Sequence, residues 1–316
     1  HGNDLVSAVG GGANADALAC GKGCRFPVVH GVAVMLPNGP FQATHENALA
    51  SIREAADPNG SGLVQNSAPD KDRIDAWVQE MVAHTNSTLY THLVGRLSRY
   101  PIPSLPIERP GKPATLLDIG CGWGRWSLAA ARQGFSPVGI DTSLKAALAA
   151  TRVAAQLGLP ARYAVADSRF MPFRPASFDA AWSYSVLQHF AKDDVIATLD
   201  GLKPLMRPGG VSKLHLLNSI GLRSLVLQLG RGFRDARGFE TRYWSVSEML
   251  RTFERHLAPS RIELDGFFVQ GRPEDRALFR PRHRIIVDVA HVLARLADRV
   301  PALRYLADNL FVVTQH

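Results

Sequence analysis

The pattern of hydrophobic and polar positions becomes regular from residue 115 onward. Short apolar runs occur at 115–119, 136–140, 163–166 and 178–182, and each ends in a glycine or a polar residue. Longer Ala- and Leu-rich stretches follow the first two runs, the second over residues 144–157. Short runs bounded in this way predict buried strands, and the longer stretches predict helices. Their alternation predicts an α/β fold with a parallel sheet.

A glycine turn follows the first predicted strand. Asp118 precedes Gly120, Gly122 and Gly124 in the order D-x-G-x-G-x-G. Glycines at a helix start let backbone N–H groups approach a ligand closely. A dinucleotide-binding turn would have its third glycine where this chain has Arg125. A carboxylate beside the turn instead favours a ligand that carries positive charge.

An aspartate also ends the second predicted strand. Asp141 lies about 20 positions after Gly120, where nucleotide-binding α/β units place an acid on a ribose diol. A carboxylate suits that role because it can accept hydrogen bonds from both hydroxyls. The alternative is a solvated aspartate at a strand end.

These segments resemble the class I S-adenosylmethionine (SAM)-dependent methyltransferases of the small-molecule type. D-I-G-C-G-W-G, V-G-I-D-T-S, A-D-S, S-F-D-A-A-W-S-Y and L-K-P-L-M-R-P-G-G follow one another in the family's order over residues 115–217. The resemblance implies a Rossmann-like seven-stranded sheet with the last strand antiparallel, and a helix, an R-P-G-G turn and the fifth strand within 202–217. It implies a transferase that converts SAM to S-adenosylhomocysteine, with no metal.

The resemblance also implies roles for residues that follow the strands. Asp167 would accept from the adenine amino group, and the backbone N–H of Ser168 would serve a ring nitrogen. The implied cofactor-binding set is Asp118, Gly120, Cys121, Gly122, Trp123, Gly124, Asp141, Thr142, Asp167, Ser168 and Ser183.

Candidate catalytic residues follow the fourth predicted strand. Methyl transfer from a sulfonium is an in-line displacement, so the enzyme mainly positions and desolvates the reactants. An acceptor that arrives protonated also needs a base. His189, in S-Y-S-V-L-Q-H-F, is the first candidate because imidazole titrates near neutral pH, and Tyr184 and His84 come next. The alternative is that His189 orients a loop or caps a helix.

The segment after residue 217 predicts an acceptor-side insertion over 218–249. Its arginines favour an acidic acceptor, because a guanidinium can bind two carboxylate or phosphate oxygens at once. The candidate substrate-binding residues are His84, Arg234, Arg237, Tyr243 and Trp244. The missing N-P-P-Y motif argues against methylation of amino groups on bases or glutamine, and favours small-molecule O-, N- or C-methylation.

Four segments divide the chain: an N-terminal module (1–54), a linker rich in Pro, Gly, Ser and Asn (55–69), a helical lead-in (70–110) and a methyltransferase domain (111–316). In the lead-in, apolar residues recur at helix spacing after an N-cap at Asp70, and a second helix is expected over 87–100.

The C-terminal part completes the expected sheet. Strands are expected at 261–269 and 309–313, and an amphipathic helix at 284–297. That helix could pack on the sheet or touch a membrane; its acids and its length favour the sheet.

The N-terminal module resembles the zinc ribbons that precede some bacterial methyltransferases. Ser7 and Gly10 stand where the first two cysteines belong, which leaves Cys20 and Cys24, with His30 on a strand-like segment. A structural zinc site needs four ligands. The segment is therefore predicted to be a small β-rich module that has lost its metal. It could cover the acceptor pocket or mediate a homodimer.

The bulk composition is that of an ordinary globular protein, with 46% hydrophobic and 20% charged residues. No apolar run is long enough to span a membrane, and three cysteines cannot form a disulfide framework, so a bacterial cytoplasmic location is expected.

The formal charge of +8 is compatible with nucleic acid, anionic lipid or an acidic small substrate, and also with a merely solvated basic surface. An RNA methyltransferase and a non-catalytic SAM-binding scaffold are the alternatives to a small-molecule methyltransferase. The lost zinc ligands argue against the first alternative, and the full set of cofactor residues argues against the second.

Overall fold

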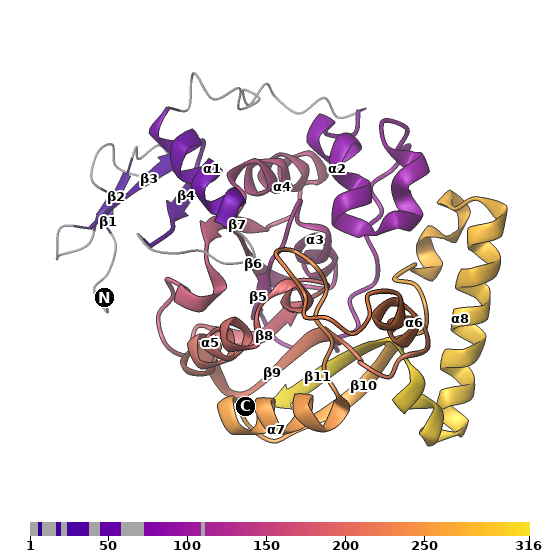
Figure 1. The fold of residues 1–316 in the computed structure, drawn as a ribbon. Helices are drawn as coiled ribbons and strands as arrows, with labels where there is room; N and C mark the ends of the chain where they lie inside the picture. Colours follow the sequence, from indigo (N-terminus) through magenta and orange to yellow (C-terminus); the bar gives the residue numbers. More distant parts are fainter. Residues whose placement is uncertain (1–5, 8–16, 20–23, 38–44, 58–72, 109–110) are drawn as a thin grey trace.

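A mixed sheet forms the centre of the molecule, as Figure 1 shows for a computed structural model. The structure describes residues 6–7, 17–19, 24–37, 45–57, 73–108 and 111–316. The strand order in the described residues is β1-β2-β3-β4-β7-β6-β5-β8-β9-β11-β10. The central strands are β5 (Ala114–Ile119), β6 (Phe135–Asp141), β7 (Arg162–Ala166), β8 (Phe178–Ser183) and β9 (Met206–Leu217).

The central strands run parallel, and the C-terminal strand reverses direction. β11 (Asn309–Gln315) pairs antiparallel with both β9 and β10 (Ser260–Gly266). The predicted seven-stranded sheet with an antiparallel last strand is therefore confirmed. One detail differs, because the two glycines of R-P-G-G lie inside β9 and not in a turn before it. Gly209 has a φ of +79° there, and its N–H donates to the carbonyl of His316.

Helices cover both faces of the sheet and bury an apolar core on each. One core contains side chains of α2 (Ala76–Asn86), α3 (Arg125–Arg132) and α4 (Leu144–Leu157). The other contains side chains of α5 (Lys192–Leu202) and α7 (Val246–His256). The predicted helix at 284–297 lies within α8 (Pro281–Arg299), which packs against β10. No helix in the described residues is long and apolar enough to cross a membrane.

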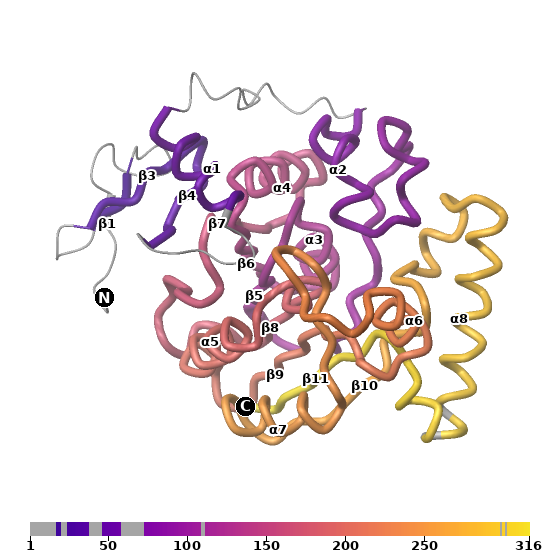
Figure 2. The backbone as a smooth tube through the Cα atoms, in the orientation of Figure 1, coloured from indigo at the N-terminus to yellow at the C-terminus, as the bar shows by residue number. Residues whose placement is uncertain are grey.

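The N-terminal segment extends the sheet. A hairpin of β3 (Arg25–Val29) and β4 (Val32–Met35) joins it through β4, which pairs parallel with β7. β1 (Val6–Ser7) and β2 (Ala17–Ala19) continue outward, so these strands and α8 lie at opposite ends of the molecule (Figure 2). His30 lies in the hairpin turn with a φ of +47°, so its expected place on a strand is wrong.

The positions that correspond to the ligands of a zinc ribbon are only partly described. Cys20 and Gly10 lie outside the described residues, Ser7 is in β1, and Cys24 immediately precedes β3. Among the residues that the structure describes, no three or more His, Cys, Asp or Glu side chains are grouped as metal ligands.

The lead-in helices differ from the prediction at both ends. Asp70 lies outside the described residues, and α2 is capped by Asp75, whose carboxylate accepts the N–H groups of Trp77 and Val78. Instead of a helix over 87–100, the chain forms a short 3-10 helix, η1 (Thr88–Leu93). The chain turns away at Gly95, which has a φ of +70° and hydrogen-bonds back to Gln79, because glycine tolerates the left-handed region that ends a helix.

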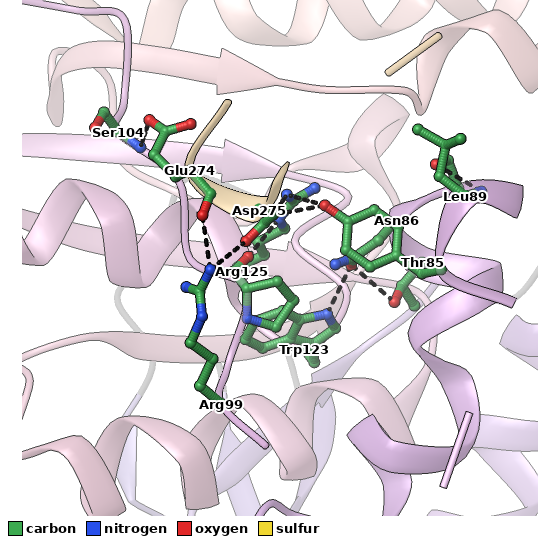
Figure 3. A network of polar contacts seen from close by, with 12 residues as sticks. Thr85, Asn86, Leu89, Arg99, Ser104, Trp123, Arg125, Glu274 and Asp275 are labelled. Carbon is green, nitrogen blue, oxygen red and sulfur yellow. Dashed lines mark hydrogen bonds and ion pairs between the residues drawn. The ribbon is translucent and has the colours of Figure 1, made fainter. Parts of the chain in front are cut away.

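A buried polar network joins the lead-in, α3 and the C-terminal segment (Figure 3). The Asp275 carboxylate, fully buried in the short helix η5 (Pro273–Leu278), accepts from the Tyr90 hydroxyl at 2.5 Å and from Arg125 at 2.9 Å. Arg125 also donates to the Pro101 carbonyl. Burial raises the pKa of Tyr90 above its ordinary value, so this hydroxyl stays protonated. Three distant parts of the chain therefore share one buried ion pair.

Removing the acid of this network should destabilise the fold. Asp275→Ala leaves the Arg125 guanidinium buried without its counter-ion, and we expect a loss of about 3–5 kcal/mol in the free energy of unfolding. Asp288→Ala is the matched control: it breaks a half-exposed pair with Arg276, which solvent screens, and should change the free energy of unfolding far less than Asp275→Ala. Urea unfolding of both variants checks this, and equal losses would contradict a special role for Asp275.

Candidate functional site

A cleft opens where the carboxyl ends of β5, β6 and β7 meet, the usual position of a ligand site in a parallel sheet. The empty space in it, including open solvent at its mouth, is about 620 Å³. Besides the strand ends, α1 (His45–Ala56), the loop after β8 and the 218–249 insertion contribute to it. The lining residues are Asn47, Ile119, Gly120, Ile140, Asp141, Thr142, Ala166, Asp167, Ser168, Ser185, Val186, His189, Phe190 and Phe239.

The glycine turn between β5 and α3 is held against the end of β6. The N–H groups of Gly120 and Cys121 both donate to the carbonyl of Ile140. Gly120 has a φ of +73°, and a Cβ atom there would lie 2.3 Å from the Val186 side chain. Only glycine fits this conformation and this close approach. The turn therefore forms one wall of the cleft with its backbone.

Asp141 stands at the end of β6 inside the cleft. One carboxylate oxygen accepts the N–H of Gly122 at 2.9 Å, and the other accepts the N–H of Ser143 at 2.9 Å. Burial raises the pKa of Asp141, while the backbone N–H donors act in the opposite direction. Since each carboxylate oxygen has two acceptor sites, both keep capacity for a hydroxyl donor. The side chain is thus fixed in direction and able to accept a diol.

Asp167 and Ser168 line the neighbouring wall, at the end of β7. The Asp167 carboxylate pairs with Arg169, whose Nη2 lies 2.6 Å from it, and Arg169 also reaches Asp194 at 2.9 Å. The Ser168 hydroxyl hydrogen-bonds to Thr198 and is buried. Arg169 thus holds the Asp167 carboxylate, and Asp194 and Thr198 on α5 hold Arg169 and the Ser168 hydroxyl in turn.

His189 lies on the opposite side of the cleft, beside the insertion. Its Nδ1 is 2.8 Å from the Phe239 carbonyl, and its ring stacks on the Phe239 ring with centroids 4.1 Å apart. Because a carbonyl only accepts, Nδ1 carries the proton and Nε2 has the lone pair. Burial and then the Arg242 charge lower the pKa of His189, although the bond to Phe239 acts against them. The imidazole is therefore neutral at pH 7.

Several sequence-predicted cofactor residues lie behind the turn and not on the cleft. Asp118 is buried and accepts from the Ser127 hydroxyl at 2.6 Å. The Trp123 indole donates to Asn86 of α2, and the Ser183 hydroxyl donates to the Ile119 carbonyl. Gly122, Gly124 and the buried Cys121, the rest of the turn, are also absent from the lining.

Tyr184 also points away from the cleft. Its hydroxyl donates to Asp265 at 2.8 Å, and the Arg272 guanidinium lies 4.7 Å from its ring centroid and 2.8 Å from Asp265. Burial raises the pKa of Tyr184 well above its ordinary value. The phenol is therefore a hydrogen-bond donor in a closed network.

The predicted substrate-binding residues are scattered. His84 is exposed on α2, and Trp244 is buried in the core, 1% exposed. Arg234 pairs with Glu240 at 2.6 Å. Arg237 is exposed and Tyr243 half-buried, and neither lines the cleft. Phe239 is the residue of the insertion that does.

Sequence reasoning missed Asn47, Val186 and Phe239. Asn47 reaches the cleft because the Ser51 hydroxyl of α1 donates to the Thr142 carbonyl and accepts the N–H of Leu144. No local pattern marked Asn47 or Phe239. Val186 belongs to the S-Y-S-V-L-Q-H-F segment, which begins at the last residue of β8. Its position just after a strand end could have suggested it.

In a comparison with known protein families, residues 116–210 match a family described as a methyltransferase domain. A ubiquinone biosynthesis O-methyltransferase of Paramagnetospirillum magneticum is 38% identical over 112 residues, 35% of this chain and 44% of the relative. A relative with the same name from Cupriavidus pinatubonensis is 31% identical over 161 residues, 48% of this chain and 62% of the relative. The chain spans about half the length of these curated relatives.

Among solved structures, the chain is similar to a SAM-dependent methyltransferase from Methanosarcina mazei. The TM-score is 0.47 at 19% identity, covering 69% of this chain and 98% of that one.

The buried Asp118 should make stability depend on pH. Burial raises its folded-state pKa from 3.8 to about 7, so the stability contributed by the protonated form is lost as pH rises through this window. Asp118→Asn stays neutral. We therefore expect the stability of the natural chain relative to this variant to fall by roughly 2–3 kcal/mol between about pH 5 and pH 8. Denaturant titrations of both proteins test this, and a constant difference would count against it.

Proposed function

We propose that this chain contains a class I SAM-dependent methyltransferase domain and that it transfers a methyl group from SAM to a small molecule. The family match over residues 116–210 supports the activity. The observation that carries the proposal is the cleft in which Asp141, a glycine turn and a neutral imidazole meet.

The cleft fits SAM by the chemistry of its walls. A nucleoside needs acceptors for its ribose diol and an apolar slot for its base. Asp141 supplies the acceptors, and Ile140, Ala166 and Phe190 supply apolar surface. Thr142 stands beside Asp141, and Asp167 and Ser168 line the wall next to it, where the adenine edge is expected. The backbone of Gly120, packed closely against Val186, lines the part of the cleft where the methionine part of the cofactor is expected.

Residues behind the turn support the cofactor indirectly in this proposal. The hydrogen bond from Ser127 to Asp118 holds α3 to β5. The Trp123–Asn86 bond holds the lead-in against the turn. Ser183 and Tyr184 fix the end of β8 and the residue after it through their bonds to Ile119 and Asp265.

The cofactor supplies an electrophilic methyl group on a sulfonium. The chain's part is to align the acceptor, exclude water and, for a protonated acceptor, receive a proton. His189 Nε2 is the receiving atom, because Nδ1 already donates to Phe239. The Gln188 amide nitrogen lies 3.3 Å from Nε2 and has to give way to the acceptor. Tyr184 is a weaker candidate, since its proton is committed to Asp265.

An oxygen of a small molecule is the proposed acceptor atom, as the names of the curated relatives favour. The apolar ring of Phe239 beside His189 suits an acceptor with an apolar or aromatic body. An acidic acceptor would have to displace Glu240 to reach Arg234. The N-terminal module serves the same site in this proposal, since Asn47 of α1 borders the cleft near Asp141.

Methyl-labelled SAM tests the activity directly. The protein is incubated with labelled SAM and a cell extract, which is then divided into organic-soluble, aqueous small-molecule and RNA fractions. We expect label in one of the first two fractions. Asp141→Ala should weaken SAM binding about 10- to 100-fold in calorimetry, because a hydrogen-bonded charge is lost. Asp179→Ala is the matched control, since Asp179 binds Thr115 and Arg207 at the other end of the strands.

The outcomes distinguish three functions: a small-molecule methyltransferase, an RNA methyltransferase and a non-catalytic SAM-binding protein. Label in RNA would replace the small-molecule proposal with an RNA methyltransferase. SAM binding without label in any fraction would favour a non-catalytic protein. Equal SAM affinity of Asp141→Ala and Asp179→Ala would overturn the assignment of the cofactor site.

Replacing His189 should change the pH profile of the reaction. The base works in its neutral form and its pKa is lowered by burial, so kcat/KM should fall only on the acid side of pH 6.5. His189→Gln should lower kcat by about 10²- to 10⁴-fold and remove this acid limb, with SAM affinity little changed. His256→Gln, which alters a pair with Asp200, is the control. An acid limb that survives in His189→Gln would exclude His189 as the base.

A further inference from the structure

The helix α6 (Leu222–Gly230) packs with its polar side inward and presents its apolar side to solvent. Ser224 is buried and Gln228 half-buried, and Gln228 donates to the carbonyls of Ser219 and Ser224. Leu225, Val226 and Leu229 are exposed, Val226 by 64%. A surface helix normally buries its apolar stripe. α6 has the opposite arrangement.

The rest of the structure holds α6 firmly in this inverted orientation. The carboxylate of Asp308, at the start of β11, accepts the N–H groups of Arg223 and Ser224 at 2.8 Å each. A Cβ atom on Gly221 would lie 2.6 Å from Asp308, so the helix start is pressed against that residue. The helix cannot turn its apolar side inward without losing this cap.

Exposed apolar side chains also precede and follow the helix in the sequence. We call this surface the α6 face, and it comprises Ile220, Leu222, Leu225, Val226, Leu227, Leu229, Phe233 and Phe239. Phe233 is 60% exposed and Phe239 58% exposed, and Phe239 stacks on His189. Arg231, directly after the helix, pairs with Glu240 at 3.9 Å and donates to the carbonyl of Thr241, so the segment that carries Phe239 returns to the end of α6. Phe239 itself lines the cleft.

Basic residues accompany the α6 face. Between positions 220 and 240 the chain has four arginines (223, 231, 234 and 237) and two acids (235 and 240). Of these, Arg234 and Arg231 both pair with Glu240, at 2.6 and 3.9 Å. An apolar helix face flanked by excess positive charge matches the physical requirements of a helix that lies in the interface of an anionic bilayer.

Two other occupants fit less well. A symmetric dimer would bring the α6 face against itself, with its arginines opposite one another, and a stable interface needs about 20–30 residues from each side. A bound apolar chain would need groove walls, and the high exposure of these side chains means that none surround them. We propose that the α6 face docks onto the surface of an anionic lipid bilayer and so places the mouth of the cleft at the membrane interface.

Vesicle co-sedimentation of the full chain tests the docking. Phosphatidylcholine vesicles are prepared with and without phosphatidylglycerol. We expect the chain to bind the anionic vesicles at least about tenfold more strongly, and to be released by salt, because salt screens the arginines. Val226→Glu with Leu229→Glu should reduce binding about tenfold or more, because two charges would enter the apolar layer.

A matched control separates docking from general hydrophobicity. Val94→Glu with Ile52→Glu alters two exposed apolar side chains outside the α6 face and should leave vesicle binding unchanged. Circular dichroism verifies that both double variants are folded. Equal binding by the α6 variant and the natural chain, or no binding to either vesicle, would overturn the proposal.

Oligomeric state tests the alternative occupant. A dimer in analytical ultracentrifugation that Val226→Glu with Leu229→Glu abolishes would assign the α6 face to a second copy and overturn membrane docking. A monomer that binds anionic vesicles would support it. These measurements use neither SAM nor an acceptor, so their failure is distinct from a failure of the proposed methyl transfer.

Discussion

The contact between the glycine turn and the end of β6 is the constraint on which the site depends. Two backbone N–H groups, of Gly120 and Cys121, share the Ile140 carbonyl, and a third, of Gly122, holds the Asp141 carboxylate. These bonds require backbone conformations with positive φ at Gly120 and Gly122. Because the same bonds fix the direction of Asp141, the wall of the cleft and its main acceptor group are set together.

Distant parts of the chain stabilise that turn from behind. Arg125 begins α3 immediately after the glycines and is buried with Asp275 and Tyr90. A buried ion pair contributes little net stability, but an unpaired buried charge is costly, so such a pair favours one arrangement of its partners. The lead-in and the C-terminal segment are therefore tied to the start of α3, and α1 is tied to the loop after β6 through Ser51.

The 218–249 insertion has a buried last part and a first part with exposed apolar side chains. Its last part is anchored in the protein, with Trp244 buried and Arg242 donating to the carbonyl of His189. Its first part, α6, keeps its apolar side in solvent because Asp308 caps the helix from below. Phe239 lies between these parts and contacts His189. The orientation of the candidate base and the exposure of an apolar surface thus arise from the same segment.

The sequence alone determined the sheet and the ligand-binding edge. Strand length, the glycines after Asp118 and the aspartates at the ends of two strands, Asp141 and Asp167, are local features, and local patterns record local backbone geometry. The tertiary structure decided which side chains face the cleft. Asp118, Trp123 and Trp244 turned inward, whereas Asn47 and Phe239 came from segments far along the chain. The side on which α6 packs was likewise set by Asp308, 84 positions after Ser224. Packing between distant segments has no period in the sequence, and therefore only the folded chain reveals it.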